Sequence, residues 1–239
     1  MPLSEVSNQI LPALLPELGN NRGPFRVLVT KDTDTVAATA PVGASAVLTP
    51  VIESALKAAD TAVSDLDLIA VSLGPGSFTG LRVGIVTAKT LAYATQCPVV
   101  GIHVADALAL QSLKSLPPSS DLDQLSIGLD IGRGEVLTYE YELQPTQFRG
   151  NHEGVILQPT AWISGLVDGQ LVTGSGLRHL DEDNKSRLIL PTQQAPTAVS
   201  VAILGLVEFA RNGGCDFWKL EPIYSRPSTA EEVRMKLGN

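Results

Sequence analysis

The sequence predicts an α/β protein of two lobes, and two patterns carry this expectation. Between residues 66 and 102, an apolar strand, a glycine-containing loop, an amphipathic helix and a second apolar strand follow one another. This order is typical of a βαβ unit with parallel strands. After a Pro-Pro-Ser-Ser loop at residues 117–120, strands with alternating apolar and polar residues appear. We therefore expect a first lobe at residues 1–110 and a second lobe at residues 111–239.

The first lobe opens with a segment that resists assignment, because prolines interrupt every apolar run of residues 1–24. Residues 25–30 and 35–39 predict two strands of a hairpin. From Thr49 to Ala59, apolar residues recur at helical spacing and indicate an amphipathic helix.

The βαβ unit follows directly. Residues 66–73 form an almost unbroken apolar run, which predicts a strand covered on both faces. A helix is expected from residue 79 to residue 95, and residues 97–102 read as the second buried strand. Such a crossover is expected to be right-handed.

The second lobe is expected to contain strands at residues 125–129, 136–141 and 170–173, and an apolar helix at residues 198–211. The polar tail at residues 221–239 is expected to be extended, to end in a short helix and to pack back on the first lobe.

Composition excludes several classes of protein. The 239 residues are 44% hydrophobic, which excludes a disordered chain. A net charge of -8, from 17 basic and 25 acidic residues, argues against autonomous binding to nucleic acid or an anionic membrane. No apolar run reaches the roughly 20 residues of a membrane helix, and the N-terminus resembles no signal or transit peptide. Cys97 and Cys215 lack the spacing of a thiolate metal site. We expect a cytoplasmic protein.

The most specific motif is the glycine loop between the strand and helix of the βαβ unit. Its residues of interest are Gly74, Pro75, Gly76, Ser77, Phe78, Thr79, Gly80 and Arg82. Glycines allow a close approach, and the free amides of a helix start attract anions, so a partner or anion contact is one interpretation. A tight βα turn with Ser77 or Thr79 as the N-cap is the other. The spacing is neither that of a Walker A loop nor that of GxGxxG.

The helix after this loop carries a ladder of small residues beside two large apolar ones. These residues are Gly80, Gly84, Ala88 and Ala92, with Leu81 and Ile85 on the neighbouring row. Such a ladder lets another element pack closely. Its partner is either the sheet of the same chain or a helix of another subunit.

Other polar groups predict no catalytic set. Asp130, in the turn at residues 130–134, could help to cradle phosphate, but an Asx turn explains it equally well. Residues 174–176, Gly-Ser-Gly, are either a second nucleotide loop or a turn. His103, His152 and His179 show no metal-binding spacing and are read as surface or loop residues, so no metal site is predicted. No serine hydrolase motif is present around Ser77.

The glycine loop also carries a family resemblance. Residues 64–67, 69–71, 74–82, 88–89 and 98–102 closely resemble the TsaB family of bacterial tRNA threonylcarbamoyladenosine biosynthesis proteins. Weaker matches lie at residues 48 and 50–52, 129–130 and 133–136, 174–176, 222–226 and 230–231. The sequence departs from the family at its start, where the nearest match to the first strand and its loop, residues 14–19, contains Pro16.

The resemblance implies an actin-like, Hsp70-like (ASKHA) fold with mixed sheets flanked by helices. It also implies a subunit without catalytic residues that pairs with a TsaD-like catalytic subunit through helices of the first lobe. The small-residue ladder on the helix after Gly80 is the pairing surface expected from the resemblance, in competition with a homodimer through the same face. The resemblance further implies that a TsaE-like ATPase completes the assembly and that this chain contacts tRNA only through the complex. No cofactor is expected to be bound tightly by this chain, and ATP or ADP is expected at the partner interface. The alternative function is an active actin-like ATP-dependent phosphotransferase that uses Asp130. A metallopeptidase is disfavoured because no histidine pair is readable.

Overall fold

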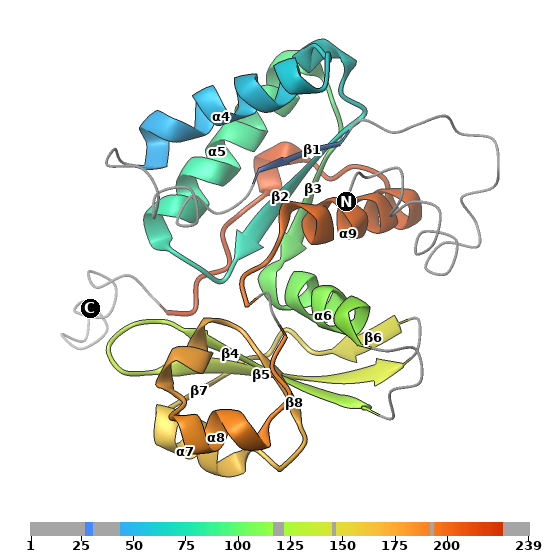
Figure 1. The fold of residues 1–239 in the computed structure, drawn as a ribbon. Coiled ribbons are helices and arrows are strands. Elements are labelled where there is room, and N and C mark those ends of the chain that lie inside the picture. The colour runs from blue at the N-terminus through green and yellow to red at the C-terminus, as the bar shows by residue number, and fades with distance from the viewer. Residues whose placement is uncertain (1–26, 31–43, 117–121, 145–146, 192–193, 227–239) are drawn as a thin grey trace.

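The computed structural model describes residues 27–30, 44–116, 122–144, 147–191 and 194–226. Within them two β-sheets lie one above the other in Figure 1, with helices on their outer faces and two further helices between them. None of the described helices is long and apolar enough to cross a membrane.

The first sheet contains β1 (Val27–Thr30), β2 (Leu68–Gly74) and β3 (Val99–His103), in that order and all parallel. Helices α4 (Ala44–Ala58) and α5 (Phe78–Thr95) cover its outer face (Figure 1). The predicted βαβ unit of β2, α5 and β3 is confirmed. Its strands read as continuous apolar runs because helices cover both faces of the sheet.

Helix α4 begins several residues before the predicted start at Thr49. The earlier start was not predicted because residues 44–47 carry little apolar periodicity. Proline is also typical of a first helical turn, whereas Pro50 lies inside this helix. The predicted strand at residues 25–30 is found as β1, from Val27. The predicted strand at residues 35–39 lies outside the described residues.

Two helices separate the sheets. Helix α9 (Ala198–Asn212) covers the inner face of the first sheet, as the core cluster of Ala70, Val100 and Val201 shows. Helix α6 (Val104–Ser115) packs between α9 and the second sheet (Figure 1). No helix is predicted at α6, because it follows β3 without a loop and therefore without turn residues to mark its start.

The second sheet is mixed. Its order is β6 (Gln147–Gly150), β5 (Val136–Gln144), β4 (Gln124–Asp130) and β8 (Leu171–Thr173), and β7 (Val155–Leu157) also pairs with β5. Only β4 and β8 are parallel among these pairs of described strands. The expected strands of this half are confirmed, and the sheets are flanked by helices as predicted.

The alternation predicted for β5 holds with one exception. Glu140 and Glu142 are exposed while Tyr139 and Tyr141 are buried. Thr138 is also buried, because β7 covers it and its hydroxyl donates to the Val155 carbonyl at 3.0 Å.

Smaller elements complete the described chain. They are η1 (Val63–Asp65), α7 (Pro159–Gly165), η2 (Ser175–His179), α8 (Glu182–Arg187) and η3 (Phe217–Lys219). Trp162 of α7 packs on Gly128 of β4, where a Cβ would lie 2.4 Å from the indole ring.

The proposed lobe boundary after residue 110 falls within α6, the helix that connects the two sheets. The division into lobes at this residue stays a prediction. The divergent segment at 1–24 and the end of the polar tail, residues 227–239, lie outside the described residues.

Candidate functional site

The glycine loop begins at the end of β2 with Gly74, a position where any other residue would be strained. Gly74 has φ of +101°, and a Cβ there would lie 2.7 Å from Leu81 Cδ1 and 2.8 Å from the Ile223 carbonyl oxygen. A side chain would therefore disturb both the turn and the C-terminal segment that crosses it. The glycine is explained by chain packing.

The start of α5 is capped by Ser77. Its Oγ accepts a hydrogen bond from the Gly80 amide at 3.3 Å, and its carbonyl accepts one from the Leu81 amide at 2.9 Å. Of the two N-cap candidates, Ser77 rather than Thr79 holds this role. The capping occupies an amide that an anion would otherwise contact.

Arg82 is engaged within the chain. Its guanidinium lies 3.8 Å above the centroid of the Phe78 ring, and its Nε donates to the Tyr224 hydroxyl at 2.8 Å. The rings of Phe78 and Tyr224 are 4.9 Å apart. Arg82 therefore joins the glycine loop to a segment far along the sequence, which no local pattern indicates.

That segment, residues 221–226, is here called the C-terminal strap. The Ile223 amide donates to the Leu73 carbonyl at 2.7 Å, next to the glycine loop. Arg226 forms an ion pair with Glu135 in the hairpin between β4 and β5. The strap thus connects the glycine loop of the first sheet with the hairpin of the second.

The ladder of small residues in α5 does not form an exposed face. The structure buries all six residues predicted for a helix interface: Gly80, Leu81, Gly84, Ile85, Ala88 and Ala92. Ile85, Ala88 and Ala92 pack with Ile69 and Val71 of β2. The prediction that these residues form a subunit contact is therefore corrected, since packing on the chain's own sheet uses them.

A different row of α5 is exposed. The side chains of Val86 and Tyr93 are each 60% exposed, and Trp218 beside them is 69% exposed. Tyr93 and Trp218 are in ring contact at 6.1 Å, and Lys89 Nζ donates to the Trp218 carbonyl at 3.3 Å. This row carries exposed apolar side chains, with the polar Lys89 and Thr90 between Val86 and Tyr93, and it is accessible where the predicted ladder is not.

Asp130 closes the hairpin between β4 and β5. Its Oδ1 accepts from the Gly132 amide at 2.7 Å, which confirms the Asx turn. Its Oδ2 lies 2.6 Å from Arg178 Nε and 2.5 Å from His179 Nε2. Both carboxylate oxygens therefore have partners within the chain.

These contacts set the charge of Asp130. Burial alone would raise the pKa of this carboxyl, but the bonds from Gly132 and His179 and the charge of Arg178 outweigh it and lower the pKa. The Asp130 amide in turn donates to Ser175 Oγ at 2.9 Å. The structure thus brings the Asp130 hairpin and the Gly174-Ser175-Gly176 turn together.

The two glycines of that turn allow close packing on β4. A Cβ at Gly174 would lie 2.3 Å from the Gly128 carbonyl oxygen, and one at Gly176 would lie 2.9 Å from it. Gly174 also has φ of +101°. Backbone packing explains both glycines without a ligand.

The histidines differ from the prediction that each is a surface or loop residue. His103 ends β3 and is 4% exposed, and His179 contacts Asp130. His152 does lie in a loop, but it stacks on His103 with ring centroids 4.2 Å apart and bonds to Asp106. Only the short spacing between His103 and Asp106, one helical turn, could have indicated this group from sequence.

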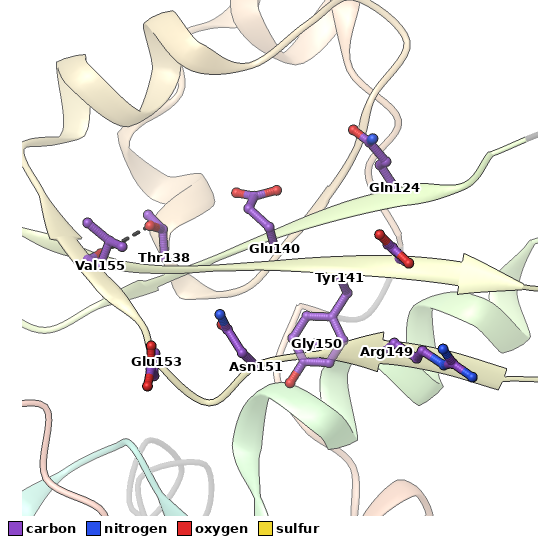
Figure 2. Close-up of a pocket in the computed structure, with 10 residues that line it drawn as sticks. Gln124, Thr138, Glu140, Tyr141, Arg149, Gly150, Asn151, Glu153 and Val155 are labelled. Atoms are coloured by element: carbon purple, nitrogen blue, oxygen red, sulfur yellow. Dashed lines mark hydrogen bonds between the residues drawn. The ribbon is translucent and has the colours of Figure 1, made fainter.

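A shallow cavity of about 640 Å³ opens along β5 and β6 (Figure 2). Glu140 and Tyr141, which both line the cavity, point to opposite sides of β5 in this view. Although Glu140 as a whole is exposed, the protein around its carboxyl partly desolvates it and raises its pKa, and the Ser126 hydroxyl, which donates to the carboxylate at 2.7 Å, opposes the shift. Its lining mixes acidic residues with Arg149.

Comparison with known proteins identifies the family. The family model described as TsaD, tRNA N6-adenosine threonylcarbamoyltransferase, matches residues 42–174. The tRNA threonylcarbamoyladenosine biosynthesis protein TsaB of Escherichia coli (strain K12) is 26% identical over 188 residues, which cover 76% of this chain and 80% of that protein.

Two further relatives match over shorter stretches. TsaB of Bacillus subtilis (strain 168) is 42% identical over 60 residues, or 25% of this chain and 26% of the relative. The tRNA N6-adenosine threonylcarbamoyltransferase of Moorella thermoacetica is 46% identical over 56 residues, or 23% of this chain and 16% of the relative. This chain therefore spans most of the E. coli relative but about a quarter or less of the other two.

Solved structures establish the fold. A Pseudomonas aeruginosa protein described as similar to peptidase YeaZ superposes with a TM-score of 0.67 at 22% identity, covering 85% of this chain and all of that chain. YeaZ from Pseudomonas aeruginosa gives 0.66 at 21% identity, covering 84% and 100%. The expected actin-like fold is confirmed. The chain belongs to the TsaD family and is, within it, a homologue of TsaB.

Proposed function

We propose that this chain is a non-catalytic scaffold of the tRNA N6-threonylcarbamoyladenosine modification complex, where it pairs with a TsaD-like catalytic subunit. The observation that carries the proposal is the similarity to E. coli TsaB, which extends over 76% of this chain and 80% of that protein. The TsaB relatives support a role in tRNA threonylcarbamoyladenosine biosynthesis.

The engagement of the candidate reactive groups supports a non-catalytic role. Both oxygens of Asp130 and the guanidinium of Arg82 are bound by other residues of the chain. A group that acts on substrate must be within hydrogen-bond reach of it. These two would first have to break their present contacts.

The exposed side chains of α5 and of the neighbouring η3 form the surface proposed for pairing. Val86, Tyr93 and Trp218 combine apolar area with exposure, and aromatic residues of this kind are frequent in the centre of interfaces. A TsaD-like subunit is the proposed partner, and a homodimer through the same face is the competing assembly.

The other partners follow from charge and from the family. With a net charge of -8 the chain is proposed to contact tRNA only within the complex, since it lacks the positive field that attracts a polyanion. A TsaE-like ATPase is proposed to supply ATP hydrolysis, with ATP or ADP at a partner interface and none bound tightly by this chain. The proposed compartment is the cytoplasm.

Co-purification with TsaD from the same organism tests the proposal, followed by nucleoside analysis of tRNA after depletion of this chain. Tyr93→Asp is expected to abolish the complex while the circular dichroism spectrum stays unchanged. Val167→Asp is the matched control, because Val167 is equally exposed, at 61%, but belongs to the second half of the chain. Normal tRNA modification in depleted cells, with no complex found, would refute the proposal.

The second candidate is an ATP-dependent phosphotransferase, and one contact favours it. The hydrogen bond between the Asp130 amide and Ser175 Oγ brings the two predicted phosphate loops side by side. Calorimetric titration of the isolated chain with ATP and Mg²⁺ distinguishes the candidates. Tight binding, with hydrolysis lost in Asp130→Ala, would favour the enzyme, whereas the absence of binding would remove it.

A further inference from the structure

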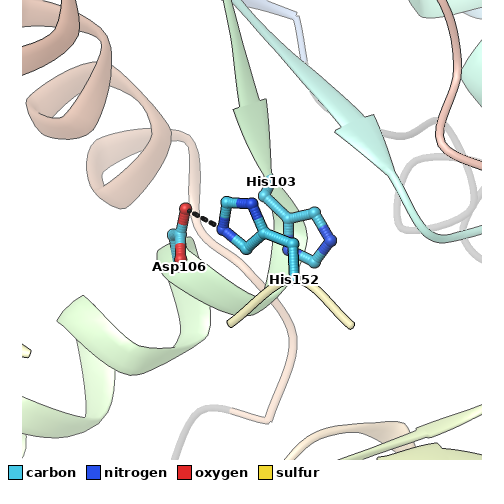
Figure 3. A group of neighbouring side chains, drawn as sticks. All are labelled: His103, Asp106 and His152. Atoms are coloured by element: carbon cyan, nitrogen blue, oxygen red, sulfur yellow. Dashed lines mark hydrogen bonds and ion pairs between the residues drawn. The ribbon is translucent and has the colours of Figure 1, made fainter. Parts of the chain in front are cut away.

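Three side chains from separate elements meet where the two sheets approach each other. His103 ends β3, Asp106 lies in the first turn of α6, and His152 lies in the loop between β6 and β7 (Figure 3). One potential ligand atom from each residue lies within 4.8 Å of the other two. These three residues are here called the His-Asp cluster.

His103 carries a polar atom that lacks a partner. Its Nδ1 accepts a hydrogen bond from the Ala105 amide at 3.1 Å, so the neutral ring carries its proton on Nε2. Among the described residues Nε2 has no hydrogen-bond partner, although the side chain is 96% buried by its 4% exposure. A buried polar atom without a partner requires an explanation. An ion bound to Nε2 is one, provided that the ring's single proton moves to Nδ1, because a nitrogen that carries a proton has no lone pair for a metal ion.

Asp106 is already oriented as ligating carboxylates are. The Tyr141 hydroxyl donates to Oδ1 at 2.7 Å, while Oδ2 faces His152 Nε2 at 2.9 Å. A hydrogen bond to the second oxygen is the usual arrangement around a metal-bound carboxylate. Oδ2 becomes available to the ion when His152 turns away and gives up its present bond to it.

Space for further ligands lies beside the cluster. All three residues line a cavity of about 780 Å³ that also contacts Arg149, Glu208 and other residues. Three protein ligands and an open fourth position facing such a space are the arrangement of many zinc sites that hold a water or a small molecule.

We propose that His103, Asp106 and His152 bind a divalent transition-metal ion of the zinc type. Two imidazoles and one carboxylate are ligands that Zn²⁺, Co²⁺ and Ni²⁺ accept, whereas Mg²⁺ and Ca²⁺ prefer oxygen alone. The ion would join β3, α6 and the loop after β6, and so both sheets. This role is additional to the proposed scaffold function and is tested on the chain alone.

One side chain has to move for the ion to bind. The rings of His103 and His152 are stacked at an angle of 10°, so both cannot direct a lone pair at one ion as they lie. His152 is the one that turns, because its side chain is 55% exposed and it lies in a loop. Binding also costs the hydrogen bond between His103 and the Ala105 amide, because Nδ1 either becomes the ligand or carries the ring's proton when Nε2 is the ligand.

The site is tested by calorimetric titration with ZnCl₂ of the full chain, which is purified without a polyhistidine tag. CoCl₂ serves as the second probe, because the visible absorption spectrum of bound Co²⁺ reports on its ligands. One ion per chain is expected. His152→Ala is expected to weaken binding at least about tenfold, the scale at which even outer contacts of a site act. His179→Ala is the matched control, because His179 also contacts an aspartate but lies outside the cluster.

A second variant guards against misfolding. His103→Asn removes the imidazole but keeps a side chain that can accept from the Ala105 amide, so α6 stays capped. Its binding is expected to fall as for His152→Ala, with an unchanged circular dichroism spectrum. Absence of Zn²⁺ and Co²⁺ binding to the natural chain, or equal binding by His152→Ala, would overturn the proposal.

Discussion

Replacing Asp130 by alanine distinguishes a structural aspartate from a catalytic one. The Asp130 side chain is only 7% exposed and has three partners in the chain: the Gly132 amide, Arg178 and His179. If it holds the hairpin, its loss should lower the free energy of unfolding. If it serves ATP chemistry, its loss should remove activity and leave stability nearly unchanged.

The expected loss can be worked out from the contacts. A hydrogen bond to a charged group contributes about 1.5 to 3 kcal/mol, which applies to the Gly132 amide. The contact with the partly buried His179 adds about 1 kcal/mol to this loss. The contact with Arg178 adds little, because the Arg178 side chain is 66% exposed and is hydrated by water once Asp130 is removed. Asp130→Ala should therefore cost about 3 kcal/mol in the free energy of unfolding.

Urea unfolding at pH 7, followed by circular dichroism, measures this difference. Asp168→Ala is the control, because Asp168 also pairs with an arginine, Arg187, but its side chain is 83% exposed. A pair of this kind contributes about 0 to 1 kcal/mol. The reasoning fails if the two variants differ by less than about 0.5 kcal/mol.

The pH dependence gives a second check. Because the pKa of Asp130 is lowered in the folded chain, its stabilisation is fully present above the ordinary value of 3.8 and is lost as the pH falls through the lowered value. The stability difference between the natural chain and Asp130→Ala should therefore shrink as the pH falls below about 4. A difference that stays constant down to pH 3 would contradict the assigned contacts.

Three further outcomes are expected. Ile85→Ala should lower the free energy of unfolding by about 2 to 5 kcal/mol in urea titrations, since it leaves a cavity between α5 and β2; a loss under about 1 kcal/mol would count against burial of the ladder. Gly205→Val should cost about 1 to 3 kcal/mol by the same assay, because even a Cβ there would lie 2.6 Å from Ala70 Cβ; an unchanged midpoint would contradict this contact. Arg226→Gln should speed hydrogen exchange in the C-terminal strap by breaking the pair with Glu135, and unchanged protection would argue against the strap.

Local patterns explain which elements the sequence could predict. The strand, loop and helix around Gly74 were predicted because their apolar residues repeat with the period of each element and glycines mark the turn between them. Helix α6 was missed because His103 both ends β3 and caps the helix, so no turn residues separate the two. The start of α4 at residue 44 was not predicted because residues 44–47 show little apolar periodicity.

The candidate site shows the same division. A row of small residues in α5 predicts close packing, but its period cannot tell whether the partner is the chain's own sheet or another molecule. Burial of Gly84 and Ala88 answered that question, and the exposed Val86 and Tyr93 became the surface available to a partner.

The sequence by itself determined the βαβ unit, the capped start of α5 and the relation to TsaB, because these depend on residues that are neighbours along the chain. Only the tertiary structure decided how Arg82 meets Tyr224, how Asp130 is held and how His103, Asp106 and His152 come together. Each of these contacts joins separate elements, and their distances follow from how two sheets and the helices between them pack. No spacing in the sequence records such packing.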